Sequence, residues 1–594
     1  MDPSSPTATT SPPPPPPRPL ILIVSHTLTG HLAPMLRISS ALCARGWTVY
    51  FLGPRAQGAR ISRTGATFVA LQGRADLSDE AYYAAPPVPG YAALPWHERV
   101  LVDLREQVLE PLPDAWASVR AALRFMRAEE EQKEKKPPRD VLVLAEAFFY
   151  GILPLRYGAP VYDDEEEGER RPRSLCVSVT VPAVRCAELP PLGYGGLLAS
   201  GGKGGESGES GSAREKERSE RLWRAWARKA APLTELLARK LREAGATRGL
   251  DPDHVFLSGE NYVCHERILQ LGVPGFEYPR ASWPAGFRFV GLVQGGGSRS
   301  RSRMDERKKK RGERKDGDDD DIEKEKEKEK GTGKENTPDF PWWPDVLANS
   351  ASLRADDPGR KKIVVVAQGT VETNPHDLII PTIRAFADPA SVSRYIVVAI
   401  LGWKSARLTS LSASSTIITT DHHPSSPPPS HPASTTPTAD AIPPNAYIAP
   451  YLSYDAVLPH ADAWVHNGGF GAVSHGIVHG VPMVVAGEGM DKGENAARVA
   501  WSGIGVDLRC GARASAAAVR EGVEYVLRDE EEEEEKEEER EEGNQGGRRR
   551  RRRGTPRQRI QELRKENEAM DCFRIVEEEL WSVARTPNPE VMMN

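Results

Sequence analysis

Cysteine is scarce in this chain, with six residues among 594. The six are scattered, and they form no C-x-x-C pair and no cluster with histidine. Small secreted folds and structural zinc sites depend on such pairs, so we predict neither a disulfide framework nor a metal site. Scattered thiols of this kind fit a reducing compartment.

Long apolar runs are missing as well. A membrane-spanning helix needs roughly 18 or more consecutive apolar residues, and the longest candidate, residues 141–155, contains Glu146. The N-terminus carries a proline run at residues 12–17, where a signal peptide would need a charged segment followed by an apolar one. We therefore expect a cytoplasmic protein without a transmembrane segment, and peripheral membrane contact stays open.

The chain also lacks a strong excess of either charge, since its net charge is -5. This small value conceals an acidic block at 530–542 and an arginine block at 548–553. The acidic block can neutralise its neighbour internally, so we expect no nucleic-acid partner.

Several stretches have no apolar periodicity and cannot bury enough surface to offset the entropy of ordering. We predict disorder in a Pro-rich tail at 1–18, insertions at about 200–218 and 406–444, a charged linker at 296–338 and an acidic/basic run at 529–555. Two domains remain, 19–295 and 339–528, followed by a terminal helix at 556–594 that we expect to dock across both.

Each of these two domains begins with a strand that ends in a polar turn. In the first, an apolar strand at 20–24 precedes a turn at 25–31, a helical pattern that stops at Gly46 and a strand at 47–52. In the second, a strand at 362–367 ends in Gln368-Gly369-Thr370. Repeated βα units predict an α/β fold with two doubly wound, Rossmann-like parallel-sheet domains that face each other across a central cleft.

A glycine-rich turn stands out within residues 463–495. An apolar run ends at Val465, glycines follow at 468, 469 and 471, and a helical segment extends to Gly480. Backbone N–H groups at a helix start converge on negative charge with the helix dipole behind them, so the turn suits an anionic ligand.

Three blocks carry a likeness to a known family: G-H-L-A-P-M-L at 30–36, V-A-Q-G-T at 366–370, and N-G-G-F-G-A-V-S-H-G-I-V-H-G-V-P-M-V-V-A-G at 467–487 with D-K-G-E-N at 491–495. In this order they resemble the family-1, UDP-sugar-dependent glycosyltransferases of GT-B fold. The resemblance implies an N-terminal acceptor-binding and a C-terminal nucleotide-sugar-binding domain. It also implies an inverting, metal-independent transfer of a hexose, glucose being the expected one, to a hydroxyl of a small lipophilic acceptor, as in secondary metabolism. UDP-sugar is then a co-substrate and no cofactor is needed.

His31 occupies the family's catalytic histidine position, and Glu146 stands where the family usually has an aspartate that orients this histidine. An imidazole can take a proton from an acceptor hydroxyl near neutral pH. Other roles stay open: His31 could cap the following helix, His26 could be the active group, and Glu146 could pair with an arginine at a sheet edge.

The likeness also assigns donor binding to a larger set of residues around the glycine turn. The set is Gly369, Thr370, His466, Asn467, Gly468, Gly469, Gly471, His475, Asp491, Lys492 and Asn495. Asn467 replaces the family's phosphate-binding histidine, His475 its ribose-binding glutamate and Lys492 the glutamine of many members. Asp491 could instead form a helix-capping pair with Glu494, and Gly369 and Thr370 could form an ordinary βα turn.

Aromatic residues of the first domain are candidates for the acceptor pocket, although such clusters are more often core. They are Tyr82, Tyr83, Trp96, Phe148, Phe149 and Tyr150. Two other functions compete with transfer. One is a catalytically impaired binding or scaffold protein of the same fold, which the changes at Asn467 and His475 favour, and the other is a nucleotide-sugar epimerase.

Overall fold

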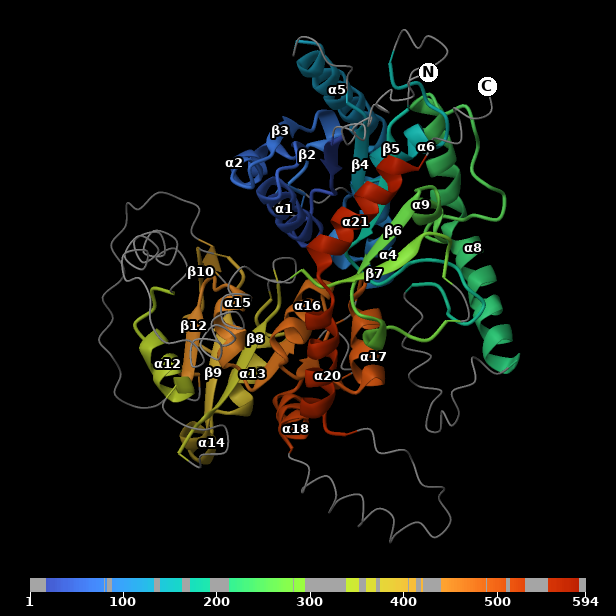
Figure 1. The fold of residues 1–594 in the computed structure, drawn as a ribbon. Coiled ribbons are helices and arrows are strands. Elements are labelled where there is room, and N and C mark those ends of the chain that lie inside the picture. Colours follow the sequence, from blue (N-terminus) through green and yellow to red (C-terminus); the bar gives the residue numbers. More distant parts are fainter. Residues whose placement is uncertain are drawn as a thin grey trace, which may run out of the picture.

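The computed structural model describes residues 18–78, 81–82, 88–132, 139–162, 171–192, 213–280, 283–293, 338–351, 359–369, 374–403, 405–412, 418–419, 440–487, 489–508, 513–528 and 554–586. These residues form two α/β domains stacked one above the other (Figure 1). The predicted tail and acidic/basic run, and most of the predicted linker, lie outside the described residues.

The N-terminal sheet has seven parallel strands in the order β3-β2-β1-β4-β5-β6-β7. They are β1 (Leu20–Val24), β2 (Val49–Gly53), β3 (Thr67–Ala70), β4 (Val141–Glu146), β5 (Arg173–Ser178), β6 (Arg267–Leu271) and β7 (Phe287–Gly291). The strand order reverses between β1 and β4, and open α/β sheets bind ligands beside the carboxyl ends at such a point.

The C-terminal sheet has six parallel strands in the order β12-β9-β8-β13-β14-β15. They are β8 (Lys362–Ala367), β9 (Tyr395–Ile400), β12 (Ala446–Ala449), β13 (Ala463–His466), β14 (Met483–Val485) and β15 (Gly505–Asp507). Here the order reverses between β8 and β13, the two strands that end at Gln368-Gly369 and at the glycine-rich turn.

Helices cover both faces of each sheet, which explains why the strands are apolar along their whole length. In the N-terminal domain these are α1 (Thr29–Ala44), α2 (Gly58–Ser62), α4 (Trp96–Asp103), a π-helical turn (Leu104–Leu109), α5 (Leu112–Glu131), α6 (Leu153–Arg156), α8 (Ala213–Glu243) and α9 (Glu260–Val263). In the C-terminal domain they are α12 (Trp343–Ala351), α13 (Ile379–Ala385), α14 (Pro389–Arg394), α15 (Tyr454–Val457), α16 (Phe470–His479), α17 (Lys492–Ser502) and α18 (Ala516–Leu527). None of the helices described is long and apolar enough to cross a membrane.

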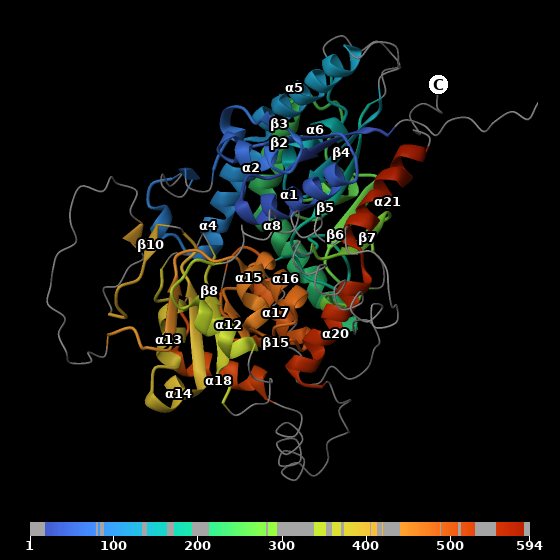
Figure 2. The ribbon, with the colours of Figure 1, turned by 60° about the vertical axis from the view of Figure 1, so that its left-hand side comes forward.

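Two helices, not one, fill the predicted terminal stretch: α20 (Pro556–Ala569) and α21 (Cys572–Arg585). A capping box of Thr555 and Gln558 starts α20, and the Asp571 side chain accepts from the Arg574 N–H at the start of α21. α20 packs on α16 and α18, whereas α21 packs on α1, β6 and β7. The pair thus runs down the outside of both domains (Figures 1 and 2).

The structure corrects both predicted insertions at their edges. Helix α8 already begins at Ala213, because its charged first turns lead directly into Trp223, which is buried and donates to the Leu189 carbonyl at 2.8 Å. In the second insertion, β10 (Ala406–Arg407) pairs antiparallel with β11 (Ile418–Thr419), and Leu411 is buried in the core.

Three strands of the two large sheets lack the long apolar run that would predict them from the sequence. They are β3, β6 and β15. β3 is a partly exposed edge strand and β15 is only three residues long. β6 carries the buried polar Gln270, whose amide donates to the Thr180 and Leu271 carbonyls, and this interrupts its apolar run.

A buried ion pair joins the two domains behind the cleft. The Arg498 guanidinium on α17 donates to both carboxylate oxygens of Glu277 at 2.8–3.1 Å and to Glu494 at 3.0 Å. All three side chains are almost fully buried. Burial disfavours the charged guanidinium, but the two carboxylates outweigh this and raise the pKa of Arg498.

Replacing Arg498 with alanine should leave the buried carboxylates of Glu277 and Glu494 without their cationic partner. We expect a loss of about 3–5 kcal/mol in unfolding free energy, the range for breaking a buried ion pair. The matched control is Arg574→Ala, which removes an exposed pair with Glu578 and should cost less than about 1 kcal/mol. Equal urea unfolding midpoints for the two variants would contradict this account of the interface.

Candidate active site

A histidine and a buried carboxylate meet at the reversal point of the N-terminal sheet. His31 lies in the first turn of α1 and Glu146 is the last residue of β4. His31 Nδ1 lies 2.9 Å from Glu146 Oε1, and the Glu146 side chain is 0% exposed against 20% for His31. His31 follows β1 and Glu146 ends β4, and the two residues meet because β1 and β4 are adjacent parallel strands.

The surroundings of Glu146 favour its ionised form. Burial would raise the pKa of this carboxyl, but His31, His26 and the Phe148 N–H outweigh burial and lower it below the usual value. An ionised Glu146 accepts the Nδ1–H of His31, which leaves the lone pair of the imidazole on Nε2. The side chain of His31 contacts Glu146, and the N-cap residue Leu28 makes no side-chain capping bond.

His26 is engaged on both ring nitrogens. Its Nδ1 accepts from the Leu28 N–H at 3.2 Å, and its Nε2 lies 3.3 Å from the Gln107 carbonyl, to which it donates. Burial and the neighbouring His31 lower the pKa of His26 to about 4. This residue therefore stays neutral and holds the loop, and a role as proton acceptor does not fit its contacts.

A cavity of about 720 Å³ lies between the domains and receives side chains from both. His26, His31 and Phe148 line it from the N-terminal domain, and Phe148 stands edge-on to the His31 ring at 5.4 Å. Of the predicted donor residues, seven line the opposite wall. They are Gly369, Asn467, Gly469, Gly471, His475, Asp491 and Lys492.

Three of the other predicted aromatics, which the structure describes, do not line this cavity. Tyr82 is buried and donates to Asp103 at 2.6 Å, and Tyr150 is buried and donates to Glu260 at 2.8 Å. Phe149 belongs to the core under the sheet. Tyr83 and the side chain of Trp96 lie outside what the structure describes.

Aliphatic residues that the sequence analysis did not single out as site residues form the N-terminal wall. Val100, Leu101, Leu104 and Val108 line the cavity from α4 and the π-helical turn. Their spacing fits a buried helical face, and a face that meets a cavity has the same spacing as one that meets other side chains. Only the tertiary arrangement separates the two.

Two strained residues also border the cavity. Leu257 (φ 61°) and Met490 (φ 46°) are the non-glycine residues in the left-handed region within the described part of the chain. Both line the cavity. Backbone strain of this kind persists where the surroundings hold it and gathers at functional sites.

The glycine-rich turn is supported from below by residues that do not reach the cavity. His466 is 0% exposed and its Nδ1 accepts the Gly468 N–H at 3.0 Å. Asn495 is also fully buried, and its amide donates to the Gly468 carbonyl at 2.8 Å and to Asp491 at 3.0 Å. Gly468 has φ +90°, and an added Cβ would meet Lys492 and Val485 atoms at 3.0 Å. These three residues shape the turn.

Asn467 faces the cavity, but its amide nitrogen also donates to the Gln368 carbonyl. The two strand ends β8 and β13 are thereby tied together beside Gly369, which has φ +76°. Thr370 lies outside the described residues.

Asp491 does not form the helix-capping pair. No side-chain capping bond is present at α17, and Asp491 Oδ2 accepts from Thr180 Oγ1 of the other domain at 2.9 Å. Glu494 instead pairs with Arg498. Asp491 therefore sits at the seam between the domains, next to Lys492 in the cavity wall.

His475 belongs to a polar cluster on the same wall. Its Nδ1 lies 3.0 Å from Asp455 Oδ1, which also receives His479 Nε2 at 2.9 Å. Arg37 of α1 binds the second oxygen of Asp455 at 2.7 Å. Burial raises the pKa of Asp455, but the hydrogen bonds of the two histidines and the charge of Arg37 outweigh it and hold the carboxyl ionised.

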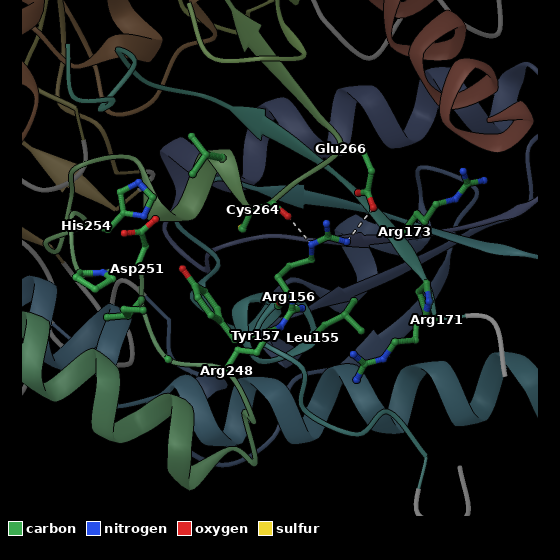
Figure 3. A pocket seen from close by; sticks show the side chains of 15 residues that line it. Leu155, Arg156, Tyr157, Arg171, Arg173, Arg248, Asp251, His254, Cys264 and Glu266 are labelled. Carbon is green, nitrogen blue, oxygen red and sulfur yellow. Dashed lines mark hydrogen bonds and ion pairs between the residues drawn. The ribbon is translucent and has the colours of Figure 1, made fainter. Parts of the chain in front are cut away.

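A second cavity, of about 670 Å³, opens on the outer side of the N-terminal domain. Figure 3 shows Arg156 directed at Cys264 and Glu266 in its wall. Arg248 similarly donates to the Arg156 carbonyl at 2.6 Å. These two arginines bind groups of the wall of this second cavity, and no predicted site residue lines it. We therefore place the candidate active site in the cavity between the domains.

The chain is similar in sequence and in fold to known proteins. Residues 430–545 match the family described as "Erythromycin biosynthesis protein CIII-like, C-terminal domain". The chain is 28% identical to UDP-glucosyltransferase B1 of Starmerella bombicola, over 83% of this chain and 87% of the relative. It is also 28% identical to UDP-glucosyltransferase 1 of Beauveria bassiana, over 94% of each chain. The crystal structure of the glycotransferase of kitacinnamycin has the same fold, with a TM-score of 0.50 at 18% identity over 95% of this chain and all of that one.

Three buried histidines should make the fold sensitive to acid. Burial lowers the pKa of His26 to about 4, and that of His265 and His466 to about 3, from an ordinary 6.5. Below pH about 6.5 these histidines are protonated in the unfolded chain but stay neutral in the folded one. The unfolding free energy therefore falls as the pH falls toward 4, by about 1.4 kcal/mol per pH unit for each histidine.

Urea unfolding between pH 7 and 5 tests this expectation. His265→Gln should flatten the pH dependence, whereas His97→Gln, which changes an exposed histidine, should leave it unchanged. The account fails if both variants lose stability with acid as steeply as the parent chain.

Proposed function

Because the chain is a family-1 UDP-glycosyltransferase-like protein of GT-B fold, we propose that it transfers glucose from UDP-glucose to a hydroxyl of a small lipophilic acceptor. We propose further that the transfer inverts the anomeric centre and needs neither a metal nor a cofactor. That the protein is a UDP-sugar-dependent glycosyltransferase rests on relatives spanning most of the chain. The observation that carries the finer proposal is the His31–Glu146 pair, set across one cavity from the glycine-rich turn.

His31 is the proposed general base. With Nδ1–H donated to Glu146, its Nε2 takes the proton of the acceptor hydroxyl as the oxygen forms a bond to the anomeric carbon of the sugar. The bond between that carbon and the diphosphate oxygen breaks, and UDP leaves with the electron pair. Glu146 stabilises the imidazolium that forms, in the way a buried carboxylate supports a catalytic histidine.

The leaving diphosphate is proposed to rest on the start of α16. Residues 469–471 open this helix at the cavity wall, and its N-cap residue, Gly469, has no side chain that could bind the N–H groups of the first turn. Helix N-terminal N–H groups stabilise developing negative charge without any rearrangement. This supports departure of UDP without a metal.

The sugar is proposed to lie near Asp491 and Lys492, between the turn and the seam. Asp491 can accept from sugar hydroxyls while it keeps its contact to Thr180, and Lys492 can donate to them. His475, in place of a ribose-binding glutamate, offers a single ring nitrogen to the ribose because its Nδ1 serves Asp455.

The wall formed by α4 and the π-helical turn supports a lipophilic acceptor. Aliphatic side chains line it beside Phe148 and Trp226, and its polar groups are His97, Asp103 and Gln107. Pockets for small apolar molecules have this composition.

The rival functions find less support. A binding or scaffold protein of the same fold would have no need for a buried, ionised carboxylate aimed at His31, whereas this chain retains one. An epimerase would need another acid/base set in the cleft, and none of the contacts described above supplies one.

His31→Ala should reduce kcat by roughly 10²–10⁴-fold, the usual contribution of a general base, with little change in UDP binding. The assay follows sugar transfer from labelled UDP-glucose to a panel of phenols and lipophilic alcohols, in the presence of EDTA. His26→Gln is the matched control and should retain most of the activity. Tight UDP binding without transfer or hydrolysis by the parent chain would favour the scaffold reading.

Leu101→Ala should raise the acceptor KM by roughly tenfold, because it removes about 1–2 kcal/mol of apolar contact. The KM for UDP-glucose should stay the same, since Leu101 lies in the N-terminal wall. Leu347→Ala changes an exposed leucine of α12 and serves as control. A change in the donor KM with no change in the acceptor KM would show that the acceptor does not bind at this wall.

A further inference from the structure

The polar atoms of two histidines and one aspartate lie close together on the C-terminal side of the cleft. The two histidines are one helical turn apart. His475 and His479 lie on the same face of α16, because residues four apart on a helix are neighbours. Their rings are nearly parallel, at 4° and 6.2 Å between centroids. Asp455 of α15 faces both, and the ligand atoms of the three side chains all lie within 4.8 Å of one another.

These three side chains match the ligand preferences of zinc. Two imidazoles and a carboxylate form a common zinc ligand set, with metal–ligand bonds of about 2.0–2.2 Å and a tetrahedral edge of about 3.3 Å. The two histidine nitrogens lie 3.0 and 2.9 Å from Asp455 Oδ1. Both distances are close to this edge, and the two histidine nitrogens lie within 4.8 Å of each other. Magnesium prefers oxygen ligands alone and fits less well.

The surroundings leave one oxygen of Asp455 for this role. Arg37 binds Oδ2, and it also donates to the Val293 carbonyl at 3.2 Å, so it orients the carboxylate from the side away from the histidines. The Tyr454 ring stands edge-on to His475 at 5.4 Å and fixes its plane. Side-chain exposures of 21%, 10% and 26% for His475, His479 and Asp455 leave a path for an ion and a water.

We propose that Asp455, His475 and His479 form a zinc-binding site on the donor side of the cleft, with water as the fourth ligand. The ion would clamp α15 to α16, the helix that follows the glycine-rich turn, in place of the hydrogen bonds that now join them. This role is structural: the ion takes no part in the proton transfer, which uses His31 and Glu146, and His475 keeps its other ring nitrogen for the ribose.

Calorimetric titration of the full-length, EDTA-treated and desalted protein with zinc chloride tests the proposal. We expect one saturable site per chain and a higher thermal unfolding midpoint with zinc, because an ion that binds only the folded state stabilises it. Asp455→Asn and His479→Gln keep hydrogen-bonding groups in place and should each weaken zinc binding at least about tenfold.

His254→Gln provides the matched control, since it removes a partly buried histidine in the outer cavity. It should bind zinc like the parent chain, and circular dichroism of the zinc-free variants should show that all of them fold. The proposal is wrong if the parent chain shows no saturable site, if Asp455→Asn and His479→Gln bind zinc unchanged, or if His254→Gln loses binding equally. Loss of sugar transfer in the His31 variant with zinc binding intact would separate the two sites.

Discussion

The hydrogen bond between His31 and Glu146 depends on the order of strands in the N-terminal sheet, and the transfer proposed above depends on that bond. Since β1 and β4 are neighbours and both run toward the cleft, the turn after one strand meets the last residue of the other. Glu146 is fully buried, so its charge is compensated by His31 and by backbone N–H groups, not by water. A carboxylate in this position costs free energy unless the histidine is there, which couples the fold to the site.

The cleft depends equally on contacts that cross it. Thr180 meets Asp491, Arg37 meets Asp455, and Glu277 meets Arg498. Arg37, Thr180 and Asp491 line the cavity, so polar pairs at its wall help to set the distance between the two domains. The helices α20 and α21 reinforce the arrangement, because α21 packs on the N-terminal domain and α20 packs on the C-terminal domain while it also contacts Pro274–Phe276 of the N-terminal one.

Much of this could be predicted from the sequence. Continuous apolar strands between βα turns indicate buried parallel sheets, and the strands at 20–24 and 362–367 coincide with β1 and β8. The glycine turn and the histidine after the first strand were visible as motifs. The roles of His466, Gly468 and Asn495 beneath the turn were not, because a motif gives the neighbours of a residue along the chain and says nothing of which side chains point inward.

The sequence by itself therefore determined the two-domain α/β class and the segments that meet at the cleft, because apolar periodicity and turn residues act locally. Tertiary structure decided which side chains face the cavity. It placed Phe148 in the wall and Tyr150 in the core, although they are two residues apart, and it turned the face of Leu101 and Leu104 toward the cavity. It also brought Asp455 to His475 and His479 across separate helices. Such choices depend on contacts between residues far apart in the chain, which no local pattern records.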